Sequence, residues 1–248
     1  MNTPMQLKKI ALLQPHKDLT REQFERYWRE VHGPLVSQSP GYLQYRLRYV
    51  QNQWLPVGPQ GLPPTWAGVA EFWLPADNED EFATTAIYQD RIRPDEARFI
   101  DFGGTVSMTA RETVIQEGNA PIKLWLVSPL RPTGIPPIAK PQDLQAMLRA
   151  SPAGSAMNLL QGWAINQVLP GSFRLPGAVT TADLDWSLIQ ILRFDSLGKL
   201  EQALAAGLLV ELTSKGLHDV ADVSFVTLER CFFDGRPLIP SQPETVGL

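Results

Sequence analysis

The sequence predicts an α+β fold made of two ferredoxin-like βαββαβ units in one chain. Hydrophobic periodicity gives the first half the order β-α-β-β-α-β, and the second half repeats it. Three pairs of matching positions lie 115, 120 and 117 residues apart: Leu7 and Ile122, Trp66 and Trp186, and Val106 and Val223. A period of this length indicates duplicated domains rather than a solenoid. We therefore expect domains at 1–118 and 119–248, joined near the polar stretch 116–120.

The first strand and helix carry the clearest local signals. A β-rich run predicts a strand at Leu7–Gln14. Thr20 and Gln23 have the spacing of a capping box, and apolar residues then recur at helical spacing as far as Leu35. Gly33 and Pro34 are expected to end this helix.

The rest of the first half follows the same order. Alternation predicts a strand at Tyr42–Gln53, with Tyr45 and Tyr49 on one face and Arg46 and Arg48 on the other, where at least one arginine should be a surface or interface charge. A third strand is expected at Trp66–Leu74. Helical spacing resumes at Glu79–Tyr88 and at Asp95–Phe102, with a break near Pro94, and the half ends on a strand at Thr105–Val114.

The second half begins with a strand at Ile122–Leu130 and a short helix opened by Pro141. An antiparallel four-stranded sheet with both helices on one face leaves its other face uncovered. The second unit is the expected cover for the first.

Composition excludes several classes of function. The 248 residues carry a net charge of −4 without a basic stripe, so nucleic acid is not an expected partner. No apolar run approaches the roughly 20 residues that span a bilayer, and the N-terminus lacks the order of a secretory signal, which predicts a cytoplasmic protein without a membrane partner. The lone Cys231 excludes an internal disulfide and is expected to be a half-buried, unreactive thiol. With three histidines (His16, His32 and His218) and no phosphate-binding glycine motif, neither a metal nor a cofactor is predicted.

Three segments together resemble the EthD family: LTREQFERYWREVHGPLV at Leu19–Val36, PGYLQYRLRYVQN at Pro40–Asn52 and DEARFIDF at Asp95–Phe102. The resemblance covers roughly the first 115 residues and implies the fold of the dimeric α/β-barrel superfamily, here formed within one chain. Many members of that superfamily act on hydrophobic or aromatic molecules without a cofactor, as lyases, isomerases, decarboxylases or oxygenases, whereas other branches bind haem. The second half lacks the histidine and the ring pair of the first, so any chemistry is expected in the first unit.

His32 is the leading catalytic candidate. It follows Trp28 by four residues on the predicted helix, so both rings should lie on one face, and imidazole titrates near neutral pH. The family motif on Tyr27, Trp28 and His32 favours a catalytic role over the alternative that His32 only caps the last helical carbonyls. Asp101 is a second catalytic candidate that would orient His32, whereas Asp95 is expected to cap a helical turn. The candidate substrate-binding residues, for each of which ordinary packing is the alternative, are Tyr27, Trp28, Tyr45, Tyr49, Trp66 and Phe99.

These observations predict a cofactor-independent enzyme that acts by acid–base chemistry, as a lyase, isomerase or decarboxylase, on a hydrophobic, aromatic or carbonyl-bearing small molecule. One alternative is a carrier that binds an apolar metabolite without transforming it. Another is a haem protein with His32 as axial ligand. Either a monomer or a homodimer is compatible with a barrel closed within one chain.

Overall fold

The computed structural model describes residues 6–58, 66–75, 81–129, 144, 146, 150, 154–169, 179–180, 186–217, 219 and 223–235. The first half contains β1 (Gln6–Pro15), α1 (Arg21–Tyr27), the π-helix η1 (Trp28–His32), α2 (Gly33–Ser37), α3 (Tyr42–Tyr45), β2 (Arg48–Leu55), β3 (Gly68–Trp73), the 3₁₀-helix η2 (Glu81–Thr84), the π-helix η3 (Tyr88–Ile92), α4 (Arg93–Glu96) and β4 (Ile100–Gln116). The second half contains β5 (Ile122–Pro129), α6 (Gly154–Met157), β6 (Gly162–Leu169), β7 (Val179–Thr180), β8 (Trp186–Phe194), α7 (Leu197–Ala205), α8 (Leu208–Ser214) and β9 (Val223–Asp234).

Eight of the described strands close into an antiparallel barrel. Their order is β1-β3-β2-β9-β5-β8-β6-β4, and β4 pairs back onto β1. The two-residue strand β7 adds a short parallel pairing to β4. Within each half the four strands take the order fourth, first, third, second, and the halves meet where β2 pairs with β9 and β4 pairs with β6. The predicted α+β class is confirmed.

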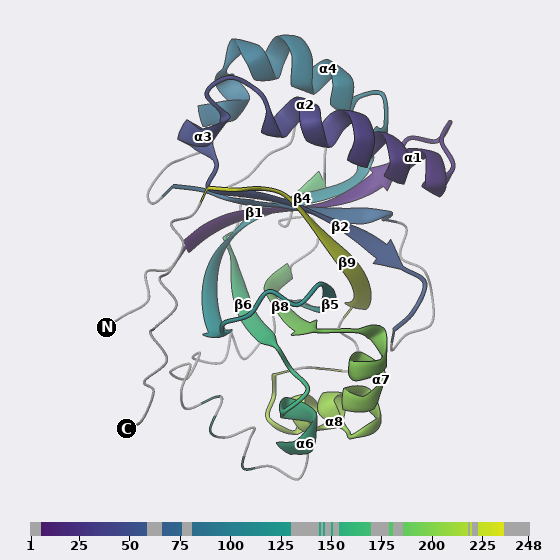
Figure 1. Ribbon diagram of the computed structural model, residues 1–248, viewed down its shortest axis with the longest axis vertical. Helices are drawn as coiled ribbons and strands as arrows, with labels where there is room; N and C mark the ends of the chain where they lie inside the picture. The colour runs from purple at the N-terminus through teal and green to yellow at the C-terminus, as the bar shows by residue number, and fades with distance from the viewer. Residues whose placement is uncertain are drawn as a thin grey trace, which may run out of the picture.

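The helices cover the outside of the barrel in two groups. Figure 1 shows α1 to α4 over the sheet of the first half and α6 to α8 over that of the second, with the barrel between them. Apolar side chains fill three regions: one under each helical group and one inside the barrel. In the barrel Trp66 and Trp186, the matching positions of the two halves, lie with ring centroids 5.7 Å apart.

The first helix begins as its sequence predicts but does not end where expected. The Thr20 hydroxyl accepts a hydrogen bond from Gln23 N, and the Gln23 side chain accepts one from Thr20 N, which confirms the capping box. The prediction that Gly33 and Pro34 end the helix is wrong. A π-helical turn at Trp28–His32 widens the helix ahead of Pro34, and the chain continues as α2. Proline cannot donate an amide and its ring clashes with the carbonyl four residues back, so a wider turn accommodates it.

The expected strand at Tyr42–Gln53 begins only at Arg48. Gly41, with φ 75°, opens the short helix α3 at Tyr42–Tyr45, so Tyr45 does not share a strand face with Tyr49. Neither arginine here is a surface charge, since Arg46 and Arg48 are 6% and 4% exposed, but Arg48 pairs with Glu229 of β9 where the two halves meet.

The segment around Pro94 also differs from its prediction. The π-helix η3 precedes Pro94 and α4 ends at Glu96, so no helix covers Asp95–Phe102; β4 instead starts at Ile100. In the second half, Pro141 and His218 lie outside the described residues.

A buried ionic network occupies one part of the barrel interior. Glu71 pairs with Lys8 (2.5 Å) and with Lys123, and Lys8 also pairs with Glu112 (2.6 Å). Glu229 lies 2.7 Å from both Lys123 and Arg193 and 2.5 Å from Arg48. Because Lys8 and Glu71 come from the first half and Lys123 and Glu229 from the second, these ion pairs join the halves across the barrel.

Candidate functional site

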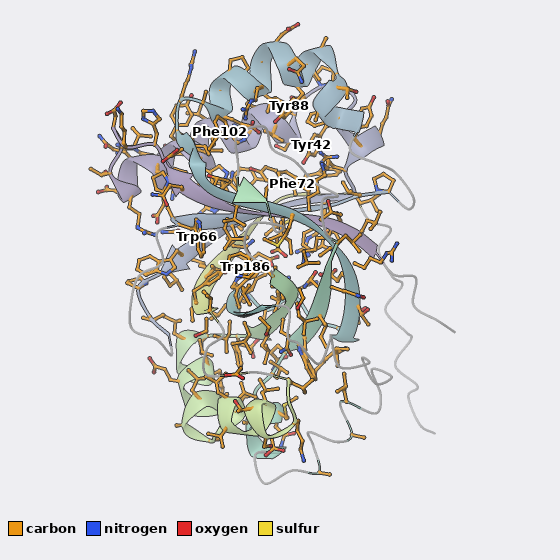
Figure 2. The ribbon with its side chains drawn as sticks, turned by 180° about the vertical axis from the view of Figure 1, so that it is seen from behind. Tyr42, Trp66, Phe72, Tyr88, Phe102 and Trp186 are labelled. Carbon is orange, nitrogen blue, oxygen red and sulfur yellow. The ribbon has the colours of Figure 1, made fainter. Side chains whose placement is uncertain are left out.

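A cavity of about 70 Å³ lies between the first-half sheet and its helices. Ala11 and Ala70, which pair across β1 and β3, leave space on the sheet face where larger residues would fill it. Figure 2 shows Tyr42, Phe72 and Tyr88 between the helices and the sheet, whereas Trp66 and Trp186 lie on the other side of the sheet, inside the barrel. The polar groups of the lining are Lys9, His32, Tyr42, Arg46, Tyr49, Tyr88 and Glu96. A mostly apolar cavity with a few polar groups is typical of small-molecule sites.

His32 is held by a carboxylate on the helical side of the cavity. Its Nδ1 lies 2.8 Å from Oδ2 of Asp95, and the hydroxyl of Tyr27 donates to Oδ1 of Asp95 at 2.5 Å. Both His32 and Asp95 are buried, at 4% and 7% exposure. Burial raises the pKa of Asp95, but the hydrogen bonds from His32 and Tyr27 outweigh it and hold the pKa below its usual value. If Nδ1 carries the proton toward Asp95, Nε2 holds the lone pair that accepts a proton from a ligand.

Glu96, the next residue along the chain, lines the cavity beside this pair. Its carboxyl accepts a hydrogen bond from the Tyr88 hydroxyl at 2.9 Å and lies 3.5 Å from an Arg93 nitrogen. Burial raises the pKa of Glu96 despite the opposing effects of His32 and these two partners. A carboxyl group with a raised pKa is suited to donating a proton near neutral pH.

Two basic side chains stand on the sheet side of the cavity. Lys9 comes from β1 and Arg46 from the turn between α3 and β2, and they are 2% and 6% exposed. Burial, followed by the charge of Arg46, lowers the pKa of Lys9 to about 6. Burial also lowers the pKa of Arg46 to about 10, against smaller opposing effects of Tyr42 and Tyr88.

Aromatic side chains form another part of the cavity wall. Tyr49 stacks on Phe72 with ring centroids 4.7 Å apart, and its hydroxyl accepts a hydrogen bond from Gln51 Nε2 at 2.9 Å. Burial raises the pKa of Tyr49, so its phenol stays neutral. The same Gln51 nitrogen donates to the Trp28 carbonyl at 2.8 Å, which ties the π-helical turn to β2.

The structure brings some of the predicted site residues together and separates others. His32, Trp28 and Tyr49 line the cavity, Tyr27 holds Asp95, and Phe99 packs behind His32 with ring centroids 4.8 Å apart. Tyr45 packs on Phe82 outside the lining, where Tyr42 takes its place. Trp66 faces the barrel interior and donates through Nε1 to the Gly104 carbonyl at 3.1 Å.

The expected roles of the two aspartates are reversed. Asp101 is exposed and accepts a hydrogen bond from Gly103 N at 2.9 Å, whereas Asp95, expected only to cap a turn, is the partner of His32. The reason is that β4 starts at Ile100, which carries Asp101 out of the helical layer.

His16 lies in the loop after β1, and its Nδ1 accepts a hydrogen bond from Asp18 N at 3.4 Å. The thiol of Cys231 is exposed rather than half-buried.

Lys9, Arg46 and Glu96 were not predicted as site residues. The signal that was available is the pair Lys8 and Lys9 within a predicted strand, where adjacent lysines must face opposite sides of the sheet.

In the described part of the chain, no cluster of three or more histidine, cysteine, aspartate or glutamate side chains could hold a metal ion. No helix among the same residues is long and apolar enough to cross a membrane.

Residues 16–103 match the model of the EthD domain. No curated protein matches the chain. Among solved structures, a candidate monooxygenase from Fusobacterium nucleatum is similar over 92% of this chain and 94% of its own, with a TM-score of 0.52 and 7% identity. A candidate monooxygenase from Lactobacillus acidophilus is similar over 92% of this chain and 96% of its own, with a TM-score of 0.51 and 6% identity.

A chlorite dismutase variant from Candidatus Nitrospira defluvii is similar over 93% of both chains, with a TM-score of 0.51 and 12% identity. At these identities the similarity concerns the fold alone. Residues 16–103 are therefore similar to the EthD domain, within a chain that has the α/β-barrel fold of the chlorite dismutase-like proteins.

Proposed function

We propose that the protein is an enzyme that moves protons on a small, carbonyl-bearing, apolar molecule, with His32 as the acid–base residue. The observation that carries the proposal is the contact of His32 Nδ1 with Asp95 at 2.8 Å on the wall of an apolar cavity. A carboxylate in that position fixes the tautomer of the imidazole and stabilises the imidazolium that forms when Nε2 takes a proton. Asp95 is thus a positioning residue.

Glu96 supplies the second half of the proposed chemistry. As His32 removes a proton from the carbon next to the carbonyl, negative charge develops on the carbonyl oxygen. Burial raises the pKa of Glu96, and its carboxyl group lines the same cavity. It would therefore donate to that oxygen. Proton removal followed by return, loss of a leaving group or loss of CO₂ gives isomerase, lyase or decarboxylase chemistry respectively.

The cavity volume limits what binds in this geometry. At about 70 Å³ it has room for roughly five waters, taking about 10–15 Å³ for each. We propose that it holds a small substrate or the reacting end of a larger one. The proposal places all of the chemistry in the first half.

We also propose that the two halves are copies of one ferredoxin-like unit, because they share one strand order.

Hydrogen exchange tests the proposal even while the product is unidentified. The purified protein is incubated in D₂O with a panel of small aliphatic and aromatic ketones, aldehydes and β-keto acids, and NMR follows loss of the proton next to the carbonyl. We expect exchange or turnover of at least one compound, slowed about 10²–10⁴-fold by His32→Gln. His16→Gln, in a surface loop, is the matched control and should leave the rate unchanged. Equal rates for His32→Gln and the unsubstituted protein would dismiss the role of His32.

The two alternatives predict different results. A carrier would bind a panel member, detected by thermal shift, and leave its protons unexchanged. A haem protein with His32 as ligand would gain a Soret band when mixed with haem. The residues around His32 do not fit a haem in this geometry, because the macrocycle is far larger than the cavity and would displace the stacked Tyr49 and Phe72 rings.

A further inference from the structure

Lys9 has no part in the proton transfer assigned to His32 and Glu96, yet it stands on the cavity wall. It lies in the middle of β1, opposite Phe72 on one side and Thr109 on the other. Directly opposed residues of antiparallel strands share a face, so Lys9 rises from the sheet beside the ring of Phe72. Its side chain is 2% exposed and lines the cavity together with Ala11, the next residue on the same face.

Lys8 and Lys9 are both buried, but their surroundings differ. Lys8 points to the opposite face, into the barrel, where it pairs with Glu71 and Glu112. Lys9 points into the cavity, where the charge that most affects it is the cation Arg46. The same strand therefore places one lysine inside the barrel and the other on the wall of the cavity that Arg46 also lines.

The environment of Lys9 favours the uncharged amine. Burial, and then the charge of Arg46, lower the pKa of Lys9 to about 6, whereas an ordinary lysine has a pKa of about 10.4 and is neutral in about one molecule in a thousand near pH 7. Desolvation and a neighbouring cation are the two features that activate lysine as a nucleophile toward carbonyl groups. The other charged or titratable groups lining the cavity are His32, Tyr42, Arg46, Tyr49, Tyr88 and Glu96.

We propose that Lys9 is a nucleophile that forms an imine with a small aldehyde or ketone bound in this cavity. This inference rests on the proposed function for the class of ligand, and it names a second, covalent role for the same site. An imine would increase the acidity of the adjacent carbon, which carries the proton that His32 is proposed to remove.

The step balances without an oxidant, a reductant or a further reactant. The Nζ lone pair attacks the carbonyl carbon, and the C=O π electrons move to the oxygen, which takes a proton while Nζ loses one. A second proton then converts the hydroxyl group to water. The water leaves with its bonding electron pair as the nitrogen lone pair forms the C=N bond. The product is the protonated imine, which gives the neutral imine when its N–H proton returns to the carboxylate that supplied the second proton. Glu96 is the proposed donor of that second proton, and hydrolysis reverses the sequence.

Reductive trapping tests the proposal on the intact, unsubstituted protein. The protein is treated at pH 7 with propanal or benzaldehyde and sodium cyanoborohydride, digested, and mapped by mass spectrometry. We expect alkylation of Lys9 at least tenfold faster than that of the exposed Lys17 and Lys199. Trapping at Lys9 should rise with pH up to about 6 and then level, whereas trapping at the exposed lysines should keep rising. Alkylation of Lys9 no faster than that of Lys17 and Lys199 would overturn the proposal.

Variants separate this inference from the role of His32. Lys9→Met should abolish the fast-reacting site, and Lys9→Arg should do the same, because a guanidinium has no free amine to trap. His32→Gln should still be trapped at Lys9, because imine formation does not need the imidazole. Trapping at Lys9 without hydrogen exchange would support the role of Lys9 and contradict the function proposed for His32. Hydrogen exchange without trapping would support the function proposed for His32 and contradict the role of Lys9. Circular dichroism of each variant checks that it is folded.

Discussion

His32 Nδ1 lies 2.8 Å from Asp95 Oδ2, and this contact joins two helical segments that are both widened by a π-turn ahead of a proline. His32 ends the turn before Pro34, and Asp95 follows Pro94. π-turns inside helices are frequent at functional sites because they shift the residues that follow around the helix. Here the two irregular turns bring an imidazole and a carboxylate together across the helical layer.

Asp95→Asn should lower the free energy of unfolding by about 1–3 kcal/mol at pH 7, because Asp95 accepts hydrogen bonds from both His32 and Tyr27. The folded state lowers the pKa of Asp95, so its contribution is present above the unfolded pKa of about 3.9 and is lost as the pH falls below it. Urea titrations at pH 7 and pH 3.5 should therefore show a smaller effect of the substitution in acid. Asp101→Asn, on the exposed residue, is the control and should stay within about 0.5 kcal/mol; an equal loss in both variants would contradict the assignment.

Lys8→Met and Lys9→Met should change stability in opposite directions. Lys8→Met removes the lysine that buried Glu71 and Glu112 share, which leaves Glu71 with Lys123 as its remaining lysine, and should cost about 3–5 kcal/mol. Lys9 has a lowered pKa, so between about pH 6 and 10 the unfolded state binds more protons and the stability of the unsubstituted protein rises with pH. Lys9→Met should remove this slope and stabilise the protein by about 2–4 kcal/mol at pH 7, with a gain that shrinks toward pH 10. Urea unfolding at pH 6, 8 and 10 measures both, and a loss of stability in Lys9→Met at every pH would contradict the prediction.

Glu71→Gln should cost about 3–5 kcal/mol, because it removes the carboxylate that lies between Lys8 and Lys123 inside the barrel. Burial raises the pKa of Glu71, but Lys123 and Lys8 outweigh it and hold the pKa far below its usual value, so the group is ionised throughout the neutral range. Glu201→Gln, on the exposed face of α7, is the control in the same urea titration and should have little effect. Adding Lys123→Gln should recover part of the loss; a double variant no more stable than the single one would argue against a direct pairing.

Gly68→Ala should destabilise the protein by about 1–3 kcal/mol and disturb the cavity. A Cβ at Gly68 would collide with the Trp28 ring and lie 2.8 Å from the carbonyl oxygen of Asn52, so Trp28 must move off the sheet. Gly198→Ala is the matched control, since the nearest atom to its added Cβ is 3.9 Å away in an exposed helix, and it should be neutral or slightly stabilising. Thermal unfolding compares the two variants, and equal melting temperatures would show that Trp28 does not need this glycine.

The sequence could predict those features of the fold that depend on neighbouring residues. The capping box at Thr20 and the alternation in β1 are local signals, and the structure contains both. The π-turns were not predictable in this way, because Pro34 and Pro94 indicate a helix end equally well, and only packing against the sheet makes the helix continue. The four-residue spacing of Trp28 and His32 is also local, and both residues line one cavity.

The rest of the site depends on tertiary structure. The sequence favours Asp101 as the partner of His32 and Asp95 as a helix cap, and only the start of β4 at Ile100 shows that Asp95 is the partner instead. Lys9 was not predicted for a different reason. A barrel strand covered by helices is buried on both faces, so the usual inference that a charged residue marks the solvent side does not hold there.

The final described strand, β9, bears on how the protein is made. It pairs with β2, and its Phe232 and Phe233 pack against Tyr49 and Tyr42 in the core beneath the first helical group. Gly33 has no side chain where the Phe232 ring approaches, so the first half leaves room for this contact. During synthesis on the ribosome, a nascent chain would present the site residues more than a hundred codons before the strand that covers Tyr42 and Tyr49 emerges. Until then the edge of β2 is unpaired, and a ribosome stalled before residue 223 would hold a first half that lacks the strand completing its core.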